Sequence, residues 1–265
     1  MGKKMKNAPV YYALAQVRFN AVLALDQYVP AIQDNLRKAG YTDFQTSFMA
    51  TINLNVSAGP EQPVPAVQPQ KRYQFLNEKR TTGFVLDQAS IIFQTTDYDV
   101  FESFSAEFVK GLSIVHSAAD LSYSERVGIR YLDAVCPKPG EQINQYLIPS
   151  VIGIAEQLAP RELVHAISDT RTKSDKSNMV SRVTTFKQNR PGAAFPVEFG
   201  AVPIKLTDKF SKIEGLYAVI DTDCWSEDRV KFDIGGLEKA LKSLHDEVEK
   251  SFNLMVTPHA RSVWE

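Results

Sequence analysis

The chain contains 265 residues, of which 44% are hydrophobic and 23% charged, and its formal net charge is −1 at pH 7. These proportions are typical of a globular protein and exclude a wholly disordered chain. A charge so close to zero gives no general electrostatic reason to bind nucleic acid or an anionic membrane surface. The length is enough for one large domain or for two halves packed together.

Two cysteines, Cys136 and Cys224, lie far apart in the sequence. This spacing argues against a disulfide framework and favours a reducing cytoplasm. Residues 1–9 are basic, but no apolar segment of a secretory leader follows them, so we predict a flexible N-terminal tail. No run of residues approaches the ~18 consecutive apolar positions of a transmembrane helix. We therefore expect a cytoplasmic protein without membrane contact.

The first half of the chain, residues 10–122, begins with a strand pattern and then a helix pattern. Alternation over 10–19 predicts a strand, and apolar spacings of three and four over 26–39 predict an amphipathic helix capped by Asp26. The buried face of the strand is expected to carry Tyr11, Ala13, Ala15, Val17 and Phe19. The same criteria predict a strand at 44–56, a proline-rich loop at 57–70, strands at 71–79 and 83–95, and an aromatic-faced helix at 98–118.

The second half, residues 123–265, repeats this order. The stretch 123–135 alternates as a strand, and a stripe of apolar residues over 141–158 predicts a helix that Pro160 ends. Beyond it we predict strands at 161–172 and 178–188, an irregular stretch at 189–214, a strand at 215–225 and a long amphipathic helix at 234–255.

Both halves therefore read β-α-β-β-β-α, and each opens with an apolar–Arg–aromatic strand, Val17-Arg18-Phe19 or Ile129-Arg130-Tyr131. Matched element order of this kind indicates an internal duplication with a pseudo-two-fold relation between the halves. The expected fold class is α+β, with two antiparallel sheets, or one continuous curved sheet, and helices on one face. Such a sheet can form a groove beneath the loops 57–70 and 189–214.

Charged residues alternate with apolar ones on three of the predicted strands. Arg18, Arg126 and Arg130 should emerge on the face opposite the helices, and Asp221 and Asp223 should share one face of the last strand. A cross-strand network of arginine and aspartate would fix the register of the sheet. Alternatively, the guanidinium groups line a groove and bind an anionic ligand such as a carboxylate or phosphate.

Other chemistry has little support in the sequence. The pattern Asp221-Thr222-Asp223 is too common to indicate a metal site, and the four histidines, His116, His165, His245 and His259, show no zinc-ligand spacing. Phosphate- and dinucleotide-binding glycine motifs are absent, so we predict no cofactor. The basic segment 171–190, with Lys173, Lys176 and Arg182, is expected to be solvated or to contact an acidic partner or nucleic acid phosphate.

The stretch Arg126-Val127-Gly128-Ile129-Arg130-Tyr131 resembles the R-x-G-[LI]-R-Y signature of a sporadically distributed family of prokaryotic proteins of similar length. The C-terminal helix, followed by Thr257 and Trp264, is similar to that family as well. The resemblance implies no established activity, and the patchy distribution implies accessory, defence or toxin-neutralising roles within mobile-element operons. Asp133 stands where the family usually has asparagine, so the resemblance assigns no side-chain role at that position.

Our first hypothesis is a non-catalytic cytoplasmic binding protein whose partner is another protein, with an operon-encoded protein as one candidate and a homodimer compatible with the sequence. The alternative is a small-molecule sensor that holds an anionic ligand in a groove between the halves, with Arg18, Arg126 and Arg130 as anchors. An enzyme that uses Asp221, Asp223 and a histidine is the least supported, and nucleic acid is not the expected partner.

Overall fold

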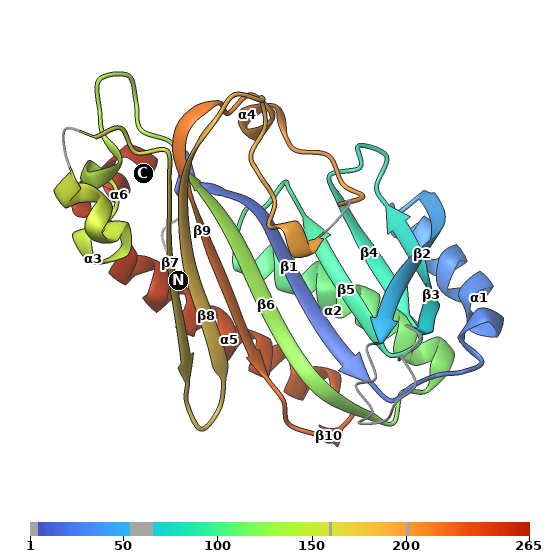
Figure 1. Ribbon diagram of the computed structural model, residues 1–265. Helices are drawn as coiled ribbons and strands as arrows, with labels where there is room; N and C mark the ends of the chain where they lie inside the picture. Colours follow the sequence, from blue (N-terminus) through green and yellow to red (C-terminus); the bar gives the residue numbers. More distant parts are fainter. Residues whose placement is uncertain (1–4, 54–65, 159–160, 200–201) are drawn as a thin grey trace, which may run out of the picture.

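The computed structural model describes residues 5–53, 66–158, 161–199 and 202–265 (Figure 1). Its centre is one antiparallel sheet in the order β2-β3-β4-β5-β1-β6-β9-β8-β7, with β10 paired to β6. The strands are β1 (Val10–Phe19), β2 (Asp43–Asn53), β3 (Ala66–Leu76), β4 (Thr82–Asp87), β5 (Ser90–Thr95), β6 (Tyr123–Val135), β7 (His165–Lys173), β8 (Asn178–Gln188), β9 (Gly215–Ser226) and β10 (Val230–Lys231). The predicted α+β class is confirmed, and of the two expected arrangements the chain adopts the single continuous sheet.

Three long helices cover one face of this sheet: α1 (Leu25–Lys38), α2 (Phe101–Ala119) and α5 (Ile234–Met255) (Figure 1). Each buries an apolar stripe at spacings of three and four, and the predicted bounds of α5 agree with the observed ones. Shorter helices, α3 (Pro149–Ile152) and α6 (Pro258–Trp264), lie near the β7 end, and α4 (Asp208–Ser211) lies within the irregular stretch after β8. None of the described helices is long and apolar enough to cross a membrane.

The two halves of the chain meet where β1 pairs with β6. Ala13 lies opposite Tyr131, Ala15 opposite Ile129 and Val17 opposite Val127. These residues belong to one hydrophobic core, which also includes buried residues of α1, α2 and α5. The helix-covered face of the sheet is therefore continuous across both halves.

Tyr11 is an exception to the predicted alternation of β1. A shift in the β1–β6 register between Val10 and Tyr12 marks a bulge, which turns Tyr11 away from the face that carries Ala13. Tyr11 packs instead against Phe195 and Phe210, in a second core on the opposite face of the sheet. The stretch predicted to be irregular, 189–214, supplies much of that second core, in the part that the structure describes.

The strand predicted at 83–95 is wrong, because the chain reverses at Gln88-Ala89 to form the β4–β5 hairpin. The reason is local: the Asp87 carboxylate accepts hydrogen bonds from the Ala89 amide at 2.9 Å and from the Ser90 hydroxyl at 2.9 Å. An aspartate that binds the backbone two residues ahead stabilises a tight turn. The first half consequently has one strand more than predicted.

The helix predicted at 141–158 is also wrong. Only short helical turns form there, at Ile143–Gln145, Pro149–Ile152 and Gly153–Leu158. Pro149 forces Ile148 into an extended conformation, and Gly153 has a φ of 70°, so the helix cannot continue through either position. As a result Ile154 and Leu158, predicted to be buried, are exposed.

Two further differences concern polar contacts and strand bounds. Asp26 does not cap α1, which starts after Ala24; its carboxylate instead accepts hydrogen bonds from Lys71 and Tyr73 of β3. Residues 66–70, predicted to be loop, belong to β3. The rest of the predicted loop, 57–65, lies outside the described residues, as do the last residues of the strand predicted at 44–56 and residues 1–4 of the predicted tail.

At Gly111, α2 packs directly against the Phe84 ring of the sheet. A Cβ atom at this position would lie 2.1 Å from the Phe84 ring of β4. We expect Gly111→Ala to lower the free energy of unfolding by about 1–3 kcal/mol through overpacking, despite the higher helix propensity of alanine. Gly235→Ala in α5, whose nearest neighbouring atom is 3.9 Å away, is the matched control and should leave stability nearly unchanged. Equal urea midpoints for the two variants would contradict this packing.

Candidate functional site

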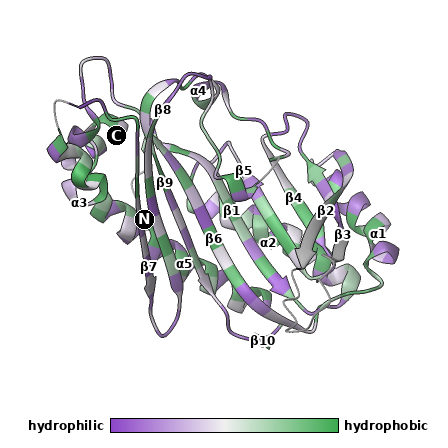
Figure 2. Cartoon of the chain, viewed as in Figure 1, coloured by the Kyte–Doolittle hydropathy of each residue, from purple (hydrophilic) through white to green (hydrophobic). Residues whose placement is uncertain are grey.

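The predicted arginines lie on the sheet face opposite α1, α2 and α5. Arg18 of β1 stands directly across from Arg126 of β6, and Arg130 lies four residues further along β6 on the same face. Figure 2 shows hydrophilic positions recurring along β1 and β6 among apolar ones. The three arginines therefore lie on the face where the alternation of side chains along β1 and β6 was expected to place them.

Arg130 is held by two carboxylates. Its Nε and Nη2 atoms donate to Asp221 at 2.7 and 2.6 Å, and Nη2 also donates to Glu198 at 2.8 Å. The Asp221 side chain is only 6% exposed, so this fork is a largely desolvated ion pair. The Arg130–Asp221 contact is the cross-strand network that the sequence predicted as one of two alternatives.

Arg126 is held less tightly than Arg130. It donates to the Gln16 side-chain oxygen, lies 3.9 Å from Asp223 and stacks on the Trp225 ring at 5.2 Å. Burial raises the pKa of Asp223, although Arg126 and Arg130 act in the opposite direction. Arg18 is exposed and faces Arg126 across the β1–β6 seam. Neither of these two arginines has a carboxylate fork like that of Arg130 among the described residues.

The basic residues of the segment 171–190 do not form one group. Lys173 ends β7 and Lys176 lies in the turn after it, whereas Arg182 of β8 points to the network. Arg182 donates to Asp169 at 2.9 and 2.7 Å and lies 3.6 Å from Glu198. The nucleic acid or acidic-partner contact of these residues stays a prediction.

A cavity of about 420 Å³, the sheet-side cavity, lies between β7, β8, β9 and the segment 194–198. Its charged lining residues are Asp169, Arg182, Glu198 and Asp221, and each of them makes an ion pair with an arginine or a carboxylate of the same network. Because these charges are already neutralised within the protein, the cavity offers a ligand little unsatisfied polarity.

A second cavity, of about 440 Å³, lies on the helix side of the sheet, and we call it the helix-side cavity. Its walls come from the start of α2, from β6, from the middle of α5 and from the N-terminal residues 5, 8, 9 and 10. It is therefore shared by both halves of the chain. Its volume is within the range of pockets that bind small molecules.

A chain of hydrogen-bonding side chains lines the helix-side cavity. The Tyr131 hydroxyl of β6 lies 3.4 Å from the Tyr98 hydroxyl and 3.1 Å from Nδ1 of His245 in α5. The His245 ring stacks on Phe101, with ring centroids 4.1 Å apart and an interplanar angle of 4°. Burial lowers the pKa of His245 below its usual value in spite of nearby carboxylates, so the ring is neutral at pH 7.

Asp133 also lines this cavity, on the same face of β6 as Tyr131. It is 8% exposed, and no hydrogen bond or ion pair joins its carboxyl group to another described residue. Burial, and then the charge of Asp221 on the other face of the sheet, raises the pKa of Asp133 to about 8. At pH 7 the group is therefore mostly a neutral carboxylic acid facing a cavity.

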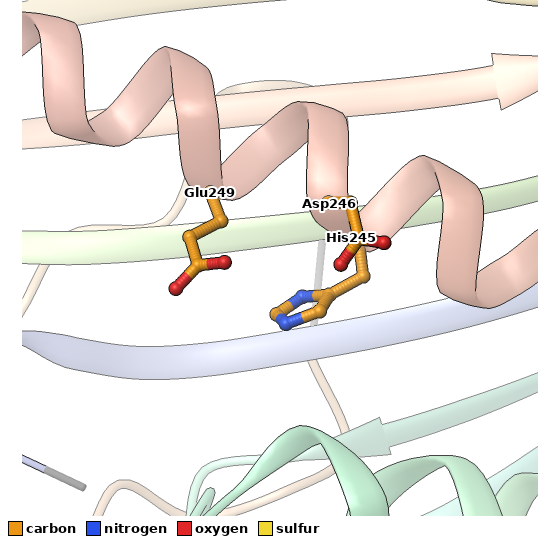
Figure 3. Close-up of side chains that lie close together, drawn as sticks. All are labelled: His245, Asp246 and Glu249. Carbon is orange, nitrogen blue, oxygen red and sulfur yellow. The ribbon is translucent and has the colours of Figure 1, made fainter. Parts of the chain in front are cut away.

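His245, Asp246 and Glu249 bring their side-chain ligand atoms within 4.8 Å of one another. In Figure 3 the side chains of His245 and Glu249 project from successive turns of α5 on one side of the helix. Asp246, however, already forms an ion pair with Lys242 at 2.6 Å, and Nδ1 of His245 contacts Tyr131. Few ligand atoms are left for a divalent ion, which prefers four or more ligands.

Sequence reasoning missed the helix-side cavity. The sequence offers no zinc-ligand spacing around His245, and it marks Asp133 only as a departure from a family pattern. One signal was present: Asp133 occupies an inward position of β6, in line with Val127, Ile129, Tyr131 and Val135. A carboxylate on an otherwise apolar strand face is uncommon and indicates either an ion pair or a site.

Comparison of the chain with protein-family models, with curated proteins and with solved structures finds no match. The resemblance of Arg126–Tyr131 to a family signature therefore stays a prediction, and the site is interpreted from its own geometry.

Removal of Arg130 tests the network. Arg130→Ala leaves Asp221 buried without its partner, and we expect the free energy of unfolding to fall by about 3 kcal/mol. Arg182→Ala, whose pair with Asp169 is more exposed, should cost about 1 kcal/mol or less. Addition of Asp221→Asn to Arg130→Ala should recover part of the loss. Equal losses for both arginines in urea unfolding would contradict the network.

The raised pKa of Asp133 predicts a pH-dependent stability difference between the wild type and Asp133→Asn. The folded state keeps a proton on Asp133 up to about pH 8, whereas the unfolded chain loses it near pH 4. The free energy of unfolding of the wild type therefore falls as pH rises between these values, because only the unfolded chain releases the Asp133 proton. Asparagine has no such proton, so the variant lacks this pH dependence. The free energy of unfolding of Asp133→Asn, relative to that of the wild type, should therefore increase by up to about 1.4 kcal/mol per pH unit between pH 5 and 7. A difference independent of pH would show that Asp133 is ionised in the folded protein.

Proposed function

We propose that the protein binds a small molecule in the helix-side cavity, between the two halves of the chain. One observation carries this proposal: the buried Asp133 carboxyl faces the cavity and has no partner among the described residues. Buried polar groups in folded proteins are almost always paired, because an unpaired one costs about 1–3 kcal/mol. A ligand that pairs with Asp133 would offset that cost.

The proposal agrees with the sensor hypothesis in placing the ligand between the halves, but on the helix-covered face of the sheet. We infer an internal duplication as the origin of this arrangement. It is supported by the strand order, in which β1 and β6 lie side by side and each has a later strand of its own half, β5 or β9, on its outer side. The cavity would then lie at the junction of the repeated units, beneath α2 and α5.

An anion-binding role on the opposite face is a second candidate. Arg18 and Arg126 stand across from each other on neighbouring strands, and two like charges in this position repel. A phosphate or carboxylate between them would relieve the repulsion. Arg130 fits this role less well, because Asp221 and Glu198 already bind it. A protein partner and an accessory role in defence remain proposals that rest on the resemblance.

Ligand binding in the helix-side cavity can be tested by saturation-transfer NMR with a library of small organic cations, anions and neutral compounds. We expect compounds that bind the wild type to lose binding in Ala8→Trp and in Glu249→Trp, because both substitutions place an indole ring in the cavity. Glu249 is exposed on α5, so its replacement should not disturb the core.

Val197→Trp is the matched control, since Val197 is 95% exposed and lines the sheet-side cavity instead. It should retain the binding of the same compounds. The proposal is wrong if no compound in the library binds, or if the compounds that bind do so equally well to the two cavity-filling variants.

A further inference from the structure

We propose that the ligand of the helix-side cavity is a small organic cation, in which an ammonium group on an apolar or aromatic body lies between the Asp133 carboxyl and the aromatic side chains around it. This inference rests on the proposed function and names the chemical class of the ligand. It differs from the anionic ligand that the arginines of the other face suggested.

The charges around the cavity favour a cation. Five carboxyl groups line it, and among the described lining residues Lys242 is the single lysine, already paired with Asp246 at 2.6 Å. A concave site with an excess of one sign of charge attracts ligands of the opposite sign. The carboxyl groups belong to Asp99, Glu102, Asp133, Asp246 and Glu249.

The walls of the cavity are suited to the rest of such a ligand. Tyr98 and Tyr131 pack edge to face, with centroids 5.3 Å apart. Phe101 also lines the cavity, and the His245 ring stacks on it. Ring faces attract ammonium groups by about 0.5–2 kcal/mol. Val248 and Phe252 of α5 add apolar surface for the body of the ligand.

Two other ligand classes fit less well. An anion would meet the carboxyl groups without a free guanidinium or ammonium group among the described lining residues. A divalent metal ion would have to compete with Lys242 for Asp246 and with Tyr131 for Nδ1 of His245. An organic cation needs no fixed ligand geometry and uses the apolar walls that a metal ion would leave empty.

The state of Asp133 couples binding to pH. Because burial and Asp221 raise its pKa to about 8, the carboxyl is mostly neutral at pH 7 and ionised at pH 9. The groups that face it from other elements are Tyr98, Asp99 and Glu102 before and within α2, and Lys242, His245, Asp246 and Glu249 on α5. Tyr131 lies beside it on β6, and the packed residues 5, 8, 9 and 10 have no titratable side chain. The pKa values of Tyr98 and Tyr131 are raised and that of His245 is lowered, so these three stay neutral from pH 7 to 9.

The charge preference can be measured by isothermal titration calorimetry at pH 7.5 with three probes of similar shape: 2-phenylethylamine, 2-phenylethanol and 3-phenylpropanoate. We expect the amine to bind at least about tenfold more tightly than the alcohol, and the carboxylate to bind most weakly. EDTA in the buffer removes divalent ions, and amine binding should persist in it.

Asp133→Asn should weaken amine binding by about tenfold or more and leave alcohol binding unchanged, since asparagine keeps the shape and removes the charge. Asp228→Asn, the same change at an exposed aspartate outside the cavity, is the matched control and should bind as the wild type does.

A permanently charged probe, benzyltrimethylammonium, separates the titration of Asp133 from that of the ligand. Its affinity for the wild type should rise by about tenfold from pH 7 to 9, because the ionised fraction of a group with a pKa of about 8 rises from about one-tenth to about nine-tenths. In Asp133→Asn this rise should disappear.

The inference is overturned if the alcohol binds as tightly as the amine, if Asp133→Asn keeps the amine affinity, or if amine binding is lost in EDTA. Binding of library compounds that Ala8→Trp abolishes, without a preference for positive charge, would leave the proposed function intact and refute only the ligand class. Absence of any binding in the cavity would refute both.

Discussion

The pairing of β1 with β6 is the interaction on which the rest of the structure depends. It joins the first half of the chain to the second in one sheet. The face of that sheet against which α1, α2 and α5 pack is therefore continuous. Because side chains alternate, β6 carries arginines on one face and Tyr131 and Asp133 on the other. The arginine network and the helix-side cavity are therefore opposite faces of the same central strand.

The two faces of the sheet differ in whether their buried charged groups have partners. On the arginine face, Arg130, Asp221, Glu198 and Arg182 neutralise one another, so the network fixes the arrangement of β6, β8 and β9 with the segment after β8. On the helix face Asp133 has no such partner among the described residues. The other two buried carboxyl groups, Asp87 and Asp221, have close partners, whereas Asp133 faces a cavity. Such a group has a local cost in stability, and binding sites are where such costs are usually found.

Much of the architecture could be predicted from periodicity, because α1, α2, α5 and the central strands bury one face each and their patterns are long. The failures have local or tertiary causes. Asp87 turns the chain inside a continuous apolar run, Pro149 and Gly153 interrupt an apolar stripe, and a bulge moves Tyr11 to the other core. The arginine face could be predicted because alternation within one strand determines it. The cavity could not, since it combines residues of α2, β6 and α5 whose proximity arises only from packing.

The central claim is that Asp133 is a buried, unpartnered acid at the cavity. The most direct measurement is the ionisation of its side chain, followed through the carboxyl carbon by NMR as pH is changed, with Asp133→Asn used to assign the signal. The structure predicts a midpoint near 8, far above that of an ordinary aspartate. A midpoint near 4 would show that the group is solvated or paired with another residue, and it would contradict the account.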